Sequence, residues 1–108
     1  MEDNIFDSLK EFIHQQRWKY KFPLERSTSL ENDLLISGLD AEKLMVEYGK
    51  TFNVDLSRFM FSDYFNLEGY SFRIFSRRAK KIKELTLGDL EKGIIAKRLD
   101  EETIENKS

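Results

Sequence analysis

Apolar residues recur along the chain at helical spacing, and this pattern predicts most of the regular structure. Three- and four-residue steps near the N-terminus place one group on a single helix face: Ile5, Phe6, Leu9, Phe12 and Ile13. This first helix is expected to end near Gln16. A second stripe predicts a helix that ends near residue 52: Ala41, Leu44, Met45, Tyr48 and Phe52.

Two capping patterns mark where helices are expected to begin. In Ser37-Gly38-Leu39-Asp40 and in Thr86-Leu87-Gly88-Asp89, a hydroxyl residue is followed three positions later by an acid, which is the spacing of a capping box. After the second pattern, four residues are expected to face inward: Leu87, Leu90, Ile94 and Ile95. A shorter helix is expected from Ser57 to Phe65, with Ser57 as its cap.

The remaining segments lack a clear period. Residues 17–24 hold the only proline and are expected to form an irregular connection. Residues 66–76 mix glycine, serine and aromatic residues, and a short extended piece is possible there. Residues 100–108 are polar and are expected to fray. We therefore expect a mainly α fold, a small bundle of about four helices, with one domain over residues 1–99 and a polar tail over 100–108.

Composition agrees with a small globular domain and removes several functional classes. The 108 residues are 40% hydrophobic and 35% charged. The net charge of −2 does not point to any particular class of partner. The absence of cysteine excludes disulfides, thiolate zinc sites and cysteine nucleophiles. No apolar stretch approaches the roughly 20 residues that span a bilayer. The first residues lack a signal-peptide pattern, so a cytoplasmic location is expected.

Short motifs in residues 28–57 and 81–95 carry a resemblance to a known family. Thr28-Ser-Leu30-Glu-Asn-Asp33-Leu34 has the form T-x-L-x-x-D-L. Leu39-Asp40 is followed by apolar residues at helical spacing up to Phe52. Phe52-Asn-Val54-Asp-Leu56 has the form of a turn that ends such a helix. Leu85-Thr-Leu-Gly-Asp89-Leu90 opens the last helix. In this order and spacing the motifs resemble the acyl and peptidyl carrier proteins.

The resemblance implies a helical bundle that carries acyl groups on 4′-phosphopantetheine, which the family attaches to the serine of an Asp-Ser-Leu motif. Asp33-Leu34 sets the register, and that motif then becomes Ser37-Gly38-Leu39, which places a glycine without a hydroxyl at the attachment position. The chain also has an insertion from Ser57 to Lys80. With this insertion it resembles most a group of small bacterial proteins with carrier-like folds whose function is not established.

Ser37 has two interpretations because it lies one residue before the attachment position. It is either a shifted phosphopantetheine site or the cap of the second helix, in place of the family's aspartate. A capping hydroxyl is bonded to a backbone N–H one turn into the helix, which leaves it less free to react. We therefore expect a cap and no prosthetic group, with a carrier modified at Ser37 as the alternative.

The resemblance also implies that the second helix contacts partner proteins. Leu39 and Val46 lie one heptad apart and off the main apolar stripe, so they either form an exposed docking edge or are partly buried against the insertion. The expected partner-binding set is Leu39, Asp40, Lys43, Val46 and Glu47. Its charge is mixed, since Glu42 and Lys50 also lie on this helix. A protein partner that contacts the second helix and the insertion is the leading interpretation.

A run of basic residues without any acid follows in the insertion: Arg73, Arg77, Arg78, Lys80, Lys81 and Lys83. Aromatic residues interleave with its beginning. Such a patch is either a solvated face or a surface for an acidic protein, an anionic membrane or nucleic acid. Nucleic-acid binding is the less favoured reading. A regulatory or scaffolding protein is a further alternative.

No group of residues has the spacing of an active site. His14 is the only histidine and has no companion metal ligands at suitable spacing. Gly88 and Gly93 are spaced as in a phosphate-binding loop, but Ile94 stands where that loop needs lysine. The carboxylates are spaced as surface ion pairs rather than as an acid and base pair. We expect a binding protein and no enzyme, metal or obligate cofactor.

Overall fold

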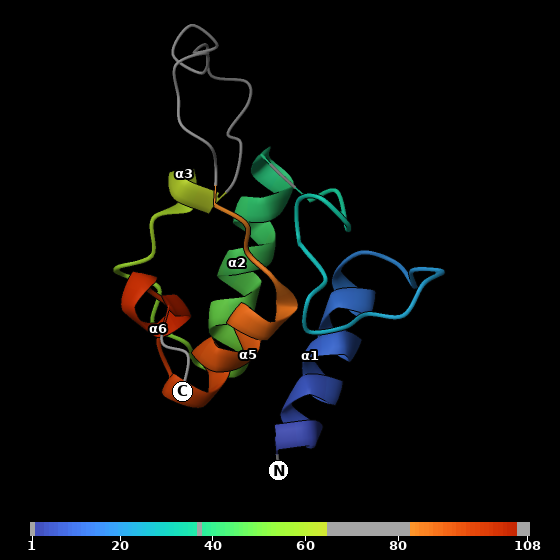
Figure 1. Cartoon of the computed structure of the whole chain (residues 1–108), viewed down its shortest axis with the longest axis horizontal. Helices are drawn as coiled ribbons and strands as arrows, with labels where there is room; N and C mark the ends of the chain where they lie inside the picture. The colour runs from blue at the N-terminus through green and yellow to red at the C-terminus, as the bar shows by residue number, and fades with distance from the viewer. Residues whose placement is uncertain (1, 37, 65–82, 106–108) are drawn as a thin grey trace, which may run out of the picture.

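Helices provide nearly all of the regular structure. The computed structural model describes residues 2–36, 38–64 and 83–105. Its helices, shown in Figure 1, are α1 (Glu2–Gln16), α2 (Gly38–Phe52), α3 (Phe61–Tyr64), α5 (Leu87–Ala96) and α6 (Glu101–Glu105). These described ranges contain no strand and only two isolated bridges. The expected mainly α fold is confirmed, whereas the possible extended piece near 66–76 lies outside the described residues.

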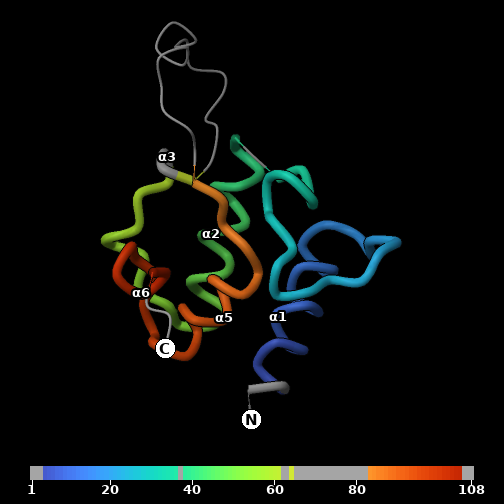
Figure 2. The backbone as a smooth tube through the Cα atoms, viewed as in Figure 1, coloured from blue at the N-terminus to red at the C-terminus, as the bar shows by residue number. Residues whose placement is uncertain are grey.

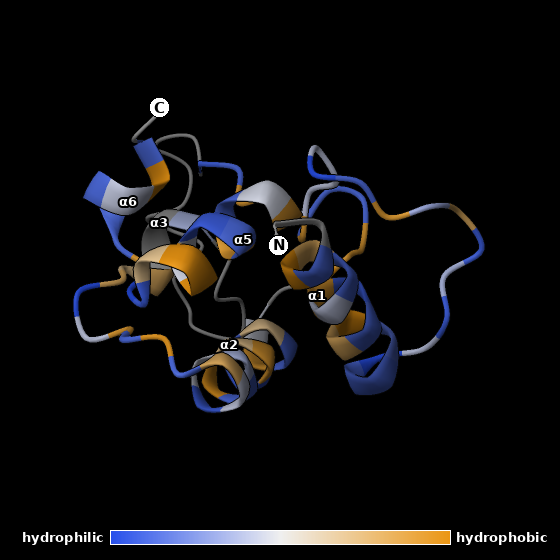
Figure 3. Cartoon of the chain, turned by 90° about the horizontal axis from the view of Figure 1, so that it is seen from below, coloured by the Kyte–Doolittle hydropathy of each residue, from blue (hydrophilic) through white to orange (hydrophobic). Residues whose placement is uncertain are grey.

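One hydrophobic core joins the helices to the loops between them. The predicted stripe of α1 is buried at Phe6, Leu9, Phe12 and Ile13. In α2, the stripe from Ala41 to Tyr48 is buried, and the ring of Phe52 packs edge-on against that of Phe12 with centroids 5.4 Å apart. Figure 3 shows the result as one apolar and one polar side on both helices. Both predicted helices and their buried stripes are confirmed, except that Ile5 of α1 and Phe52 of α2 are only half-buried.

The inward face of α5 is narrower than expected. Leu87 and Leu90 are fully buried and Ile94 packs partly against the core, but Ile95 is 51% exposed. The expectation for Ile95 is wrong because adjacent residues point about 100° apart around a helix, and Ile94 takes the inward position one turn after Leu90. Ile95 is therefore a surface residue.

The predicted capping box at Thr86 is present. The Thr86 hydroxyl accepts a hydrogen bond from the Asp89 N–H at 3.2 Å, and the Asp89 carboxylate accepts one from the Thr86 N–H at 3.0 Å. These bonds satisfy donors that the first helical turn leaves without partners. Burial nevertheless raises the pKa of Asp89. The corresponding cap at Ser37 lies outside the described residues.

The expected helix from Ser57 to Phe65 is shorter in the structure, which has only α3 at residues 61–64. The Asp55 carboxylate accepts a hydrogen bond from the Ser57 N–H at 2.9 Å, and the Phe59 N–H is bonded to the Leu56 carbonyl. The chain forms a turn at residues 57 and 58 in place of a first helical turn, and Phe59 is buried against the core. The prediction is wrong for residues 57–60, and Ser57 is not a helix cap.

The expectation of a frayed tail is wrong for residues 100–105, because α6 covers residues 101–105, while residues 106–108 lie outside the described ranges. The Asp100 carboxylate caps this helix by accepting a hydrogen bond from the Thr103 N–H at 2.8 Å. Leu99 is fully buried, and its N–H is bonded to the Asp55 carbonyl. The folded domain therefore continues past residue 99.

The connection between α1 and α2 packs along the segment that leads into α5 (Figure 2). Leu30 donates a backbone hydrogen bond to the Leu85 carbonyl at 2.9 Å, and Leu87 donates one to the Thr28 carbonyl at 3.0 Å. These bonds hold the approach to α2 against the body of the domain. In the part of the chain that the structure describes, no helix has the length and apolar character needed to cross a membrane.

Candidate docking surface

The outer face of α2 displays two large apolar side chains. Leu39 is 72% exposed and Val46 is 44% exposed, while the opposite side of the helix is buried. Both side chains are thus exposed relative to the described residues, whereas the alternative of burial against the insertion involves residues 65–82, which lie outside them. Apolar residues that are exposed together on one helix face are typical of a surface that binds another molecule.

A groove of about 660 Å³ runs between the end of α1 and the outer side of α2. Four of the five residues expected to bind a partner line it, namely Asp40, Lys43, Val46 and Glu47. The groove also includes Gln16, Arg17, Glu42 and Leu44. The structure thus brings these four residues together beside a wall from the end of α1, whereas Leu39 does not line the groove.

Arg17 fixes the geometry of this wall. Its guanidinium lies 3.2 Å from the Asp40 carboxylate and 4.4 Å from the centre of the Trp18 ring. Its Nε donates a hydrogen bond to the Tyr20 hydroxyl, and that hydroxyl donates one to the Leu34 carbonyl at 3.2 Å. Arg17 therefore ties the end of α1 to both the start of α2 and the loop before it. Arg17 was not predicted to belong to the site. The only signal in the sequence is an arginine among aromatic residues.

Acidic residues outnumber basic ones in the segment that carries the exposed apolar positions. Within residues 31–50 there are five acids, Glu31, Asp33, Asp40, Glu42 and Glu47, against the two bases Lys43 and Lys50, and Lys50 Nζ lies 3.9 Å from the Glu47 carboxylate. All five acids are exposed or half-buried. Arg17 compensates one of them through its pair with Asp40. The segment around the start of α2 therefore combines exposed apolar side chains with a net negative charge, and we call its five acids the acidic rim.

Leu35 has an unusual backbone conformation just before α2. Its φ is 59°, in the left-handed region, and its side chain is 74% exposed. For a bulky residue this region costs about 1–2 kcal/mol. The neighbours Leu34 and Ile36 are almost fully buried, and the Ile36 N–H is bonded to the Leu30 carbonyl. With both neighbours anchored inward, the side chain of Leu35 faces solvent.

Several predicted positions lie outside the described residues. They are Ser37, Arg73, Arg77, Arg78, Lys80 and Lys81, so both the shifted attachment site and most of the basic patch stay predictions. Lys83 is described, and its Nζ lies 2.9 Å from the Glu101 carboxylate. Gly38, where the resemblance predicts the attachment position, is the first residue of α2 and has a φ of 62°.

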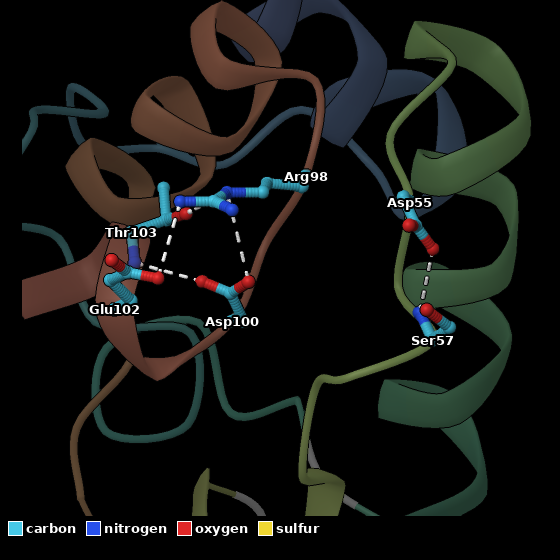
Figure 4. Close-up of polar contacts among 6 residues, drawn as sticks. All are labelled: Asp55, Ser57, Arg98, Asp100, Glu102 and Thr103. Carbon is cyan, nitrogen blue, oxygen red and sulfur yellow. Dashed lines mark hydrogen bonds and ion pairs between the residues drawn. The ribbon is translucent and has the colours of Figure 1, made fainter.

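A second polar cluster holds the C-terminal segment in place (Figure 4). Arg98 lies 3.7 Å from the Asp100 carboxylate and 3.4 Å from that of Glu102. Hydrogen bonds from backbone N–H groups lower the pKa of Asp55 and of Asp100. These carboxylates are therefore charged at neutral pH and engaged within the fold. We assign the cluster a structural role.

No metal-binding group of three or more His, Cys, Asp or Glu residues occurs among the described residues. His14 is half-buried, and its Nε2 atom has no hydrogen-bond partner in the described part of the chain. The ring of Tyr20 lies 6.4 Å from the His14 ring, centre to centre. The histidine thus sits among packed side chains rather than in a set of ligands.

A protein-family model described as "Protein of unknown function (DUF1493)" matches residues 1–98. Comparisons with curated proteins and with solved structures returned no match. The matched segment runs from α1 through α5 and includes the whole candidate docking surface. It stops before α6.

Proposed function

This chain belongs to the DUF1493 family of proteins of unknown function, and we propose that it is a non-catalytic module that docks a partner protein through α2. The observation that carries the proposal is the exposure of Leu39 and Val46 on the outer face of this helix. The partner surface that fits them has an apolar groove or face with basic side chains at its edges.

The two parts of the surface have different physical roles. Burial of Leu39 and Val46 supplies affinity, since each large apolar side chain removed from water contributes about 1.5–3 kcal/mol. The acidic rim adds little net affinity, but it speeds the approach of a basic partner and selects its orientation. The ion pair between Arg17 and Asp40 keeps the groove wall in place before binding, which lowers the entropic cost of docking.

The resemblance to carrier proteins supports the same assignment for α2. In that family the second helix is the surface that partners recognise, and here this helix carries the exposed apolar residues. We infer a module that keeps the carrier-like docking surface without a prosthetic group, because Gly38 offers no hydroxyl at the attachment position. A scaffolding or regulatory role is consistent with such a module.

Docking is tested with a synthetic amphipathic helix that has leucine on one face and lysine on the other. Titration into ¹⁵N-labelled protein is expected to shift amide signals of α2, and Leu39→Glu is expected to weaken binding at least about tenfold by placing a charge at the apolar centre. Ile95→Glu, at an exposed apolar position of α5, is the matched control and should bind as the unaltered chain does. Equal binding by both variants would contradict the proposal.

The absence of a prosthetic group is tested by intact mass. After incubation with coenzyme A and a broad-range phosphopantetheinyl transferase, the mass of the purified chain is expected to stay unchanged. A conventional acyl carrier protein in a parallel reaction confirms that the transferase is active. An added phosphopantetheine mass that disappears in Ser37→Ala would instead identify a carrier modified at Ser37.

A further inference from the structure

The fold explains why residue 35 has a positive φ but not why it is a leucine. Glycine or asparagine adopts this conformation at little cost. Leu34 and Ile36 anchor the chain on either side, and the hydrogen bond from the Tyr20 hydroxyl to the Leu34 carbonyl fixes the approach. The exposed Leu35 side chain lies outside the buried core. A strained leucine that faces solvent therefore calls for a reason beyond folding.

The other non-glycine residues with positive φ in the described ranges have ordinary explanations. Asn53 follows the end of α2, and Lys97 is the C-cap of α5. Helices commonly end in the left-handed conformation, and both of these residues are polar. Leu35 is different, because it is apolar and precedes a helix.

We propose that Leu35 is a further apolar anchor of the docking surface beside Leu39 and Val46, held exposed beside the start of α2 by its left-handed backbone. The inference rests on the proposed docking function and names a further residue that determines partner affinity. Leu35 and Leu39 are four residues apart, so their Cα atoms are separated by at most about 14 Å. One face of a partner helix reaches both, since two turns span about 11 Å.

Charge complementarity defines the occupant as a basic amphipathic helix. The two leucines lie within the segment 31–50, which has five acids and two lysines and is therefore net acidic. Leucine side chains on the partner would cover Leu35 and Leu39, and lysine or arginine on its flanks would face the acidic rim. An acidic amphipathic helix of the same leucine pattern would be repelled from this rim.

The test compares Leu35→Gly with Lys97→Gly in titrations with the leucine–lysine peptide. Both substitutions relieve a left-handed non-glycine residue, so each is expected to leave the melting temperature unchanged or to raise it by about 2–6 °C. Only Leu35→Gly removes an anchor, and it is expected to weaken peptide binding about tenfold. Leu35→Asn should behave in the same way, because asparagine tolerates this conformation.

The outcomes separate this inference from the proposed function. Loss of binding in Leu39→Glu but not in Leu35→Gly would refute the anchor at Leu35 and leave docking through α2 intact. No binding of the peptide to the unaltered chain would refute the proposed function itself. A lower melting temperature for Leu35→Gly than for Lys97→Gly would show that Leu35 serves the fold, which also overturns the inference. A leucine–glutamate peptide that binds equally well would refute the basic occupant.

Discussion

Replacing Gly93 by alanine is expected to destabilise the protein by about 2–3 kcal/mol, the typical range for a side chain forced into a packed core. A Cβ atom at this position would overlap the Tyr48 hydroxyl and would lie 3.0 Å from a methyl group of Leu99. Tyr48 is fully buried, and its hydroxyl donates a 2.7 Å hydrogen bond to the Leu90 carbonyl. Urea denaturation followed by circular dichroism measures the loss.

Gly49→Ala in α2 is the matched control for this substitution. A Cβ at Gly49 would lie 3.0 Å from a methyl group of Leu56, which is able to move, and 3.2 Å from the Val54 carbonyl oxygen, so no contact there is as close as the one with the Tyr48 hydroxyl at Gly93. Its expected loss is therefore smaller than at Gly93. Tyr48→Phe removes the obstructing hydroxyl, so Gly93→Ala should cost less in the Tyr48→Phe background than in the unaltered chain. Equal costs in the two backgrounds would contradict this account of the contact.

Removal of the Arg26 side chain is expected to cost about 2 kcal/mol of folding stability. Arg26 Nε and Nη2 form two hydrogen bonds, of 2.6 and 3.0 Å, with the carboxylate of Glu91, which is buried. The guanidinium also lies 4.5 Å from the centre of the Phe6 ring. Arg26→Ala would leave the Glu91 charge buried without this partner. Because Arg26 is half-exposed, the cost falls below the 3–5 kcal/mol typical of a fully buried pair.

A double-mutant cycle checks the cause of this loss. Glu91→Gln removes the charge, so Arg26→Ala should cost clearly less when Glu91→Gln is already present. Lys50→Ala breaks only the exposed 3.9 Å pair with Glu47 and is expected to change stability by less than about 0.5 kcal/mol. Independent, additive effects of the Arg26 and Glu91 substitutions would show that the ion pair is not the origin of the loss.

The sequence predicted those parts of the fold that depend on local patterns. Helical periodicity identified α1 and α2, and the capping pattern at Thr86 located the start of α5. The errors arose where long-range contacts decide the structure. Backbone hydrogen bonds join Asp55, which precedes α3, to residues 97–99, which precede α6. No local sequence pattern reveals that these two segments meet.

The candidate site divides in the same way. Leu39 and Val46 were identified from their position off the buried stripe of α2, which is a local property. Arg17 was missed because its partner Asp40 is distant in sequence. Leu35 was missed because a leucine gives no indication of a positive φ, which here results from the burial of its two neighbours.

Because Leu99 is buried, the folded unit extends further along the chain than the family match does. The match ends at residue 98, yet Leu99 fills space beside Gly93, and Thr103 of α6 is also buried. A fragment that ends at residue 98 would lack the Leu99 side chain, which would leave a cavity beside Gly93 and expose the C-terminal end of α5. A minimal stable fragment of this protein therefore needs the chain through Glu105.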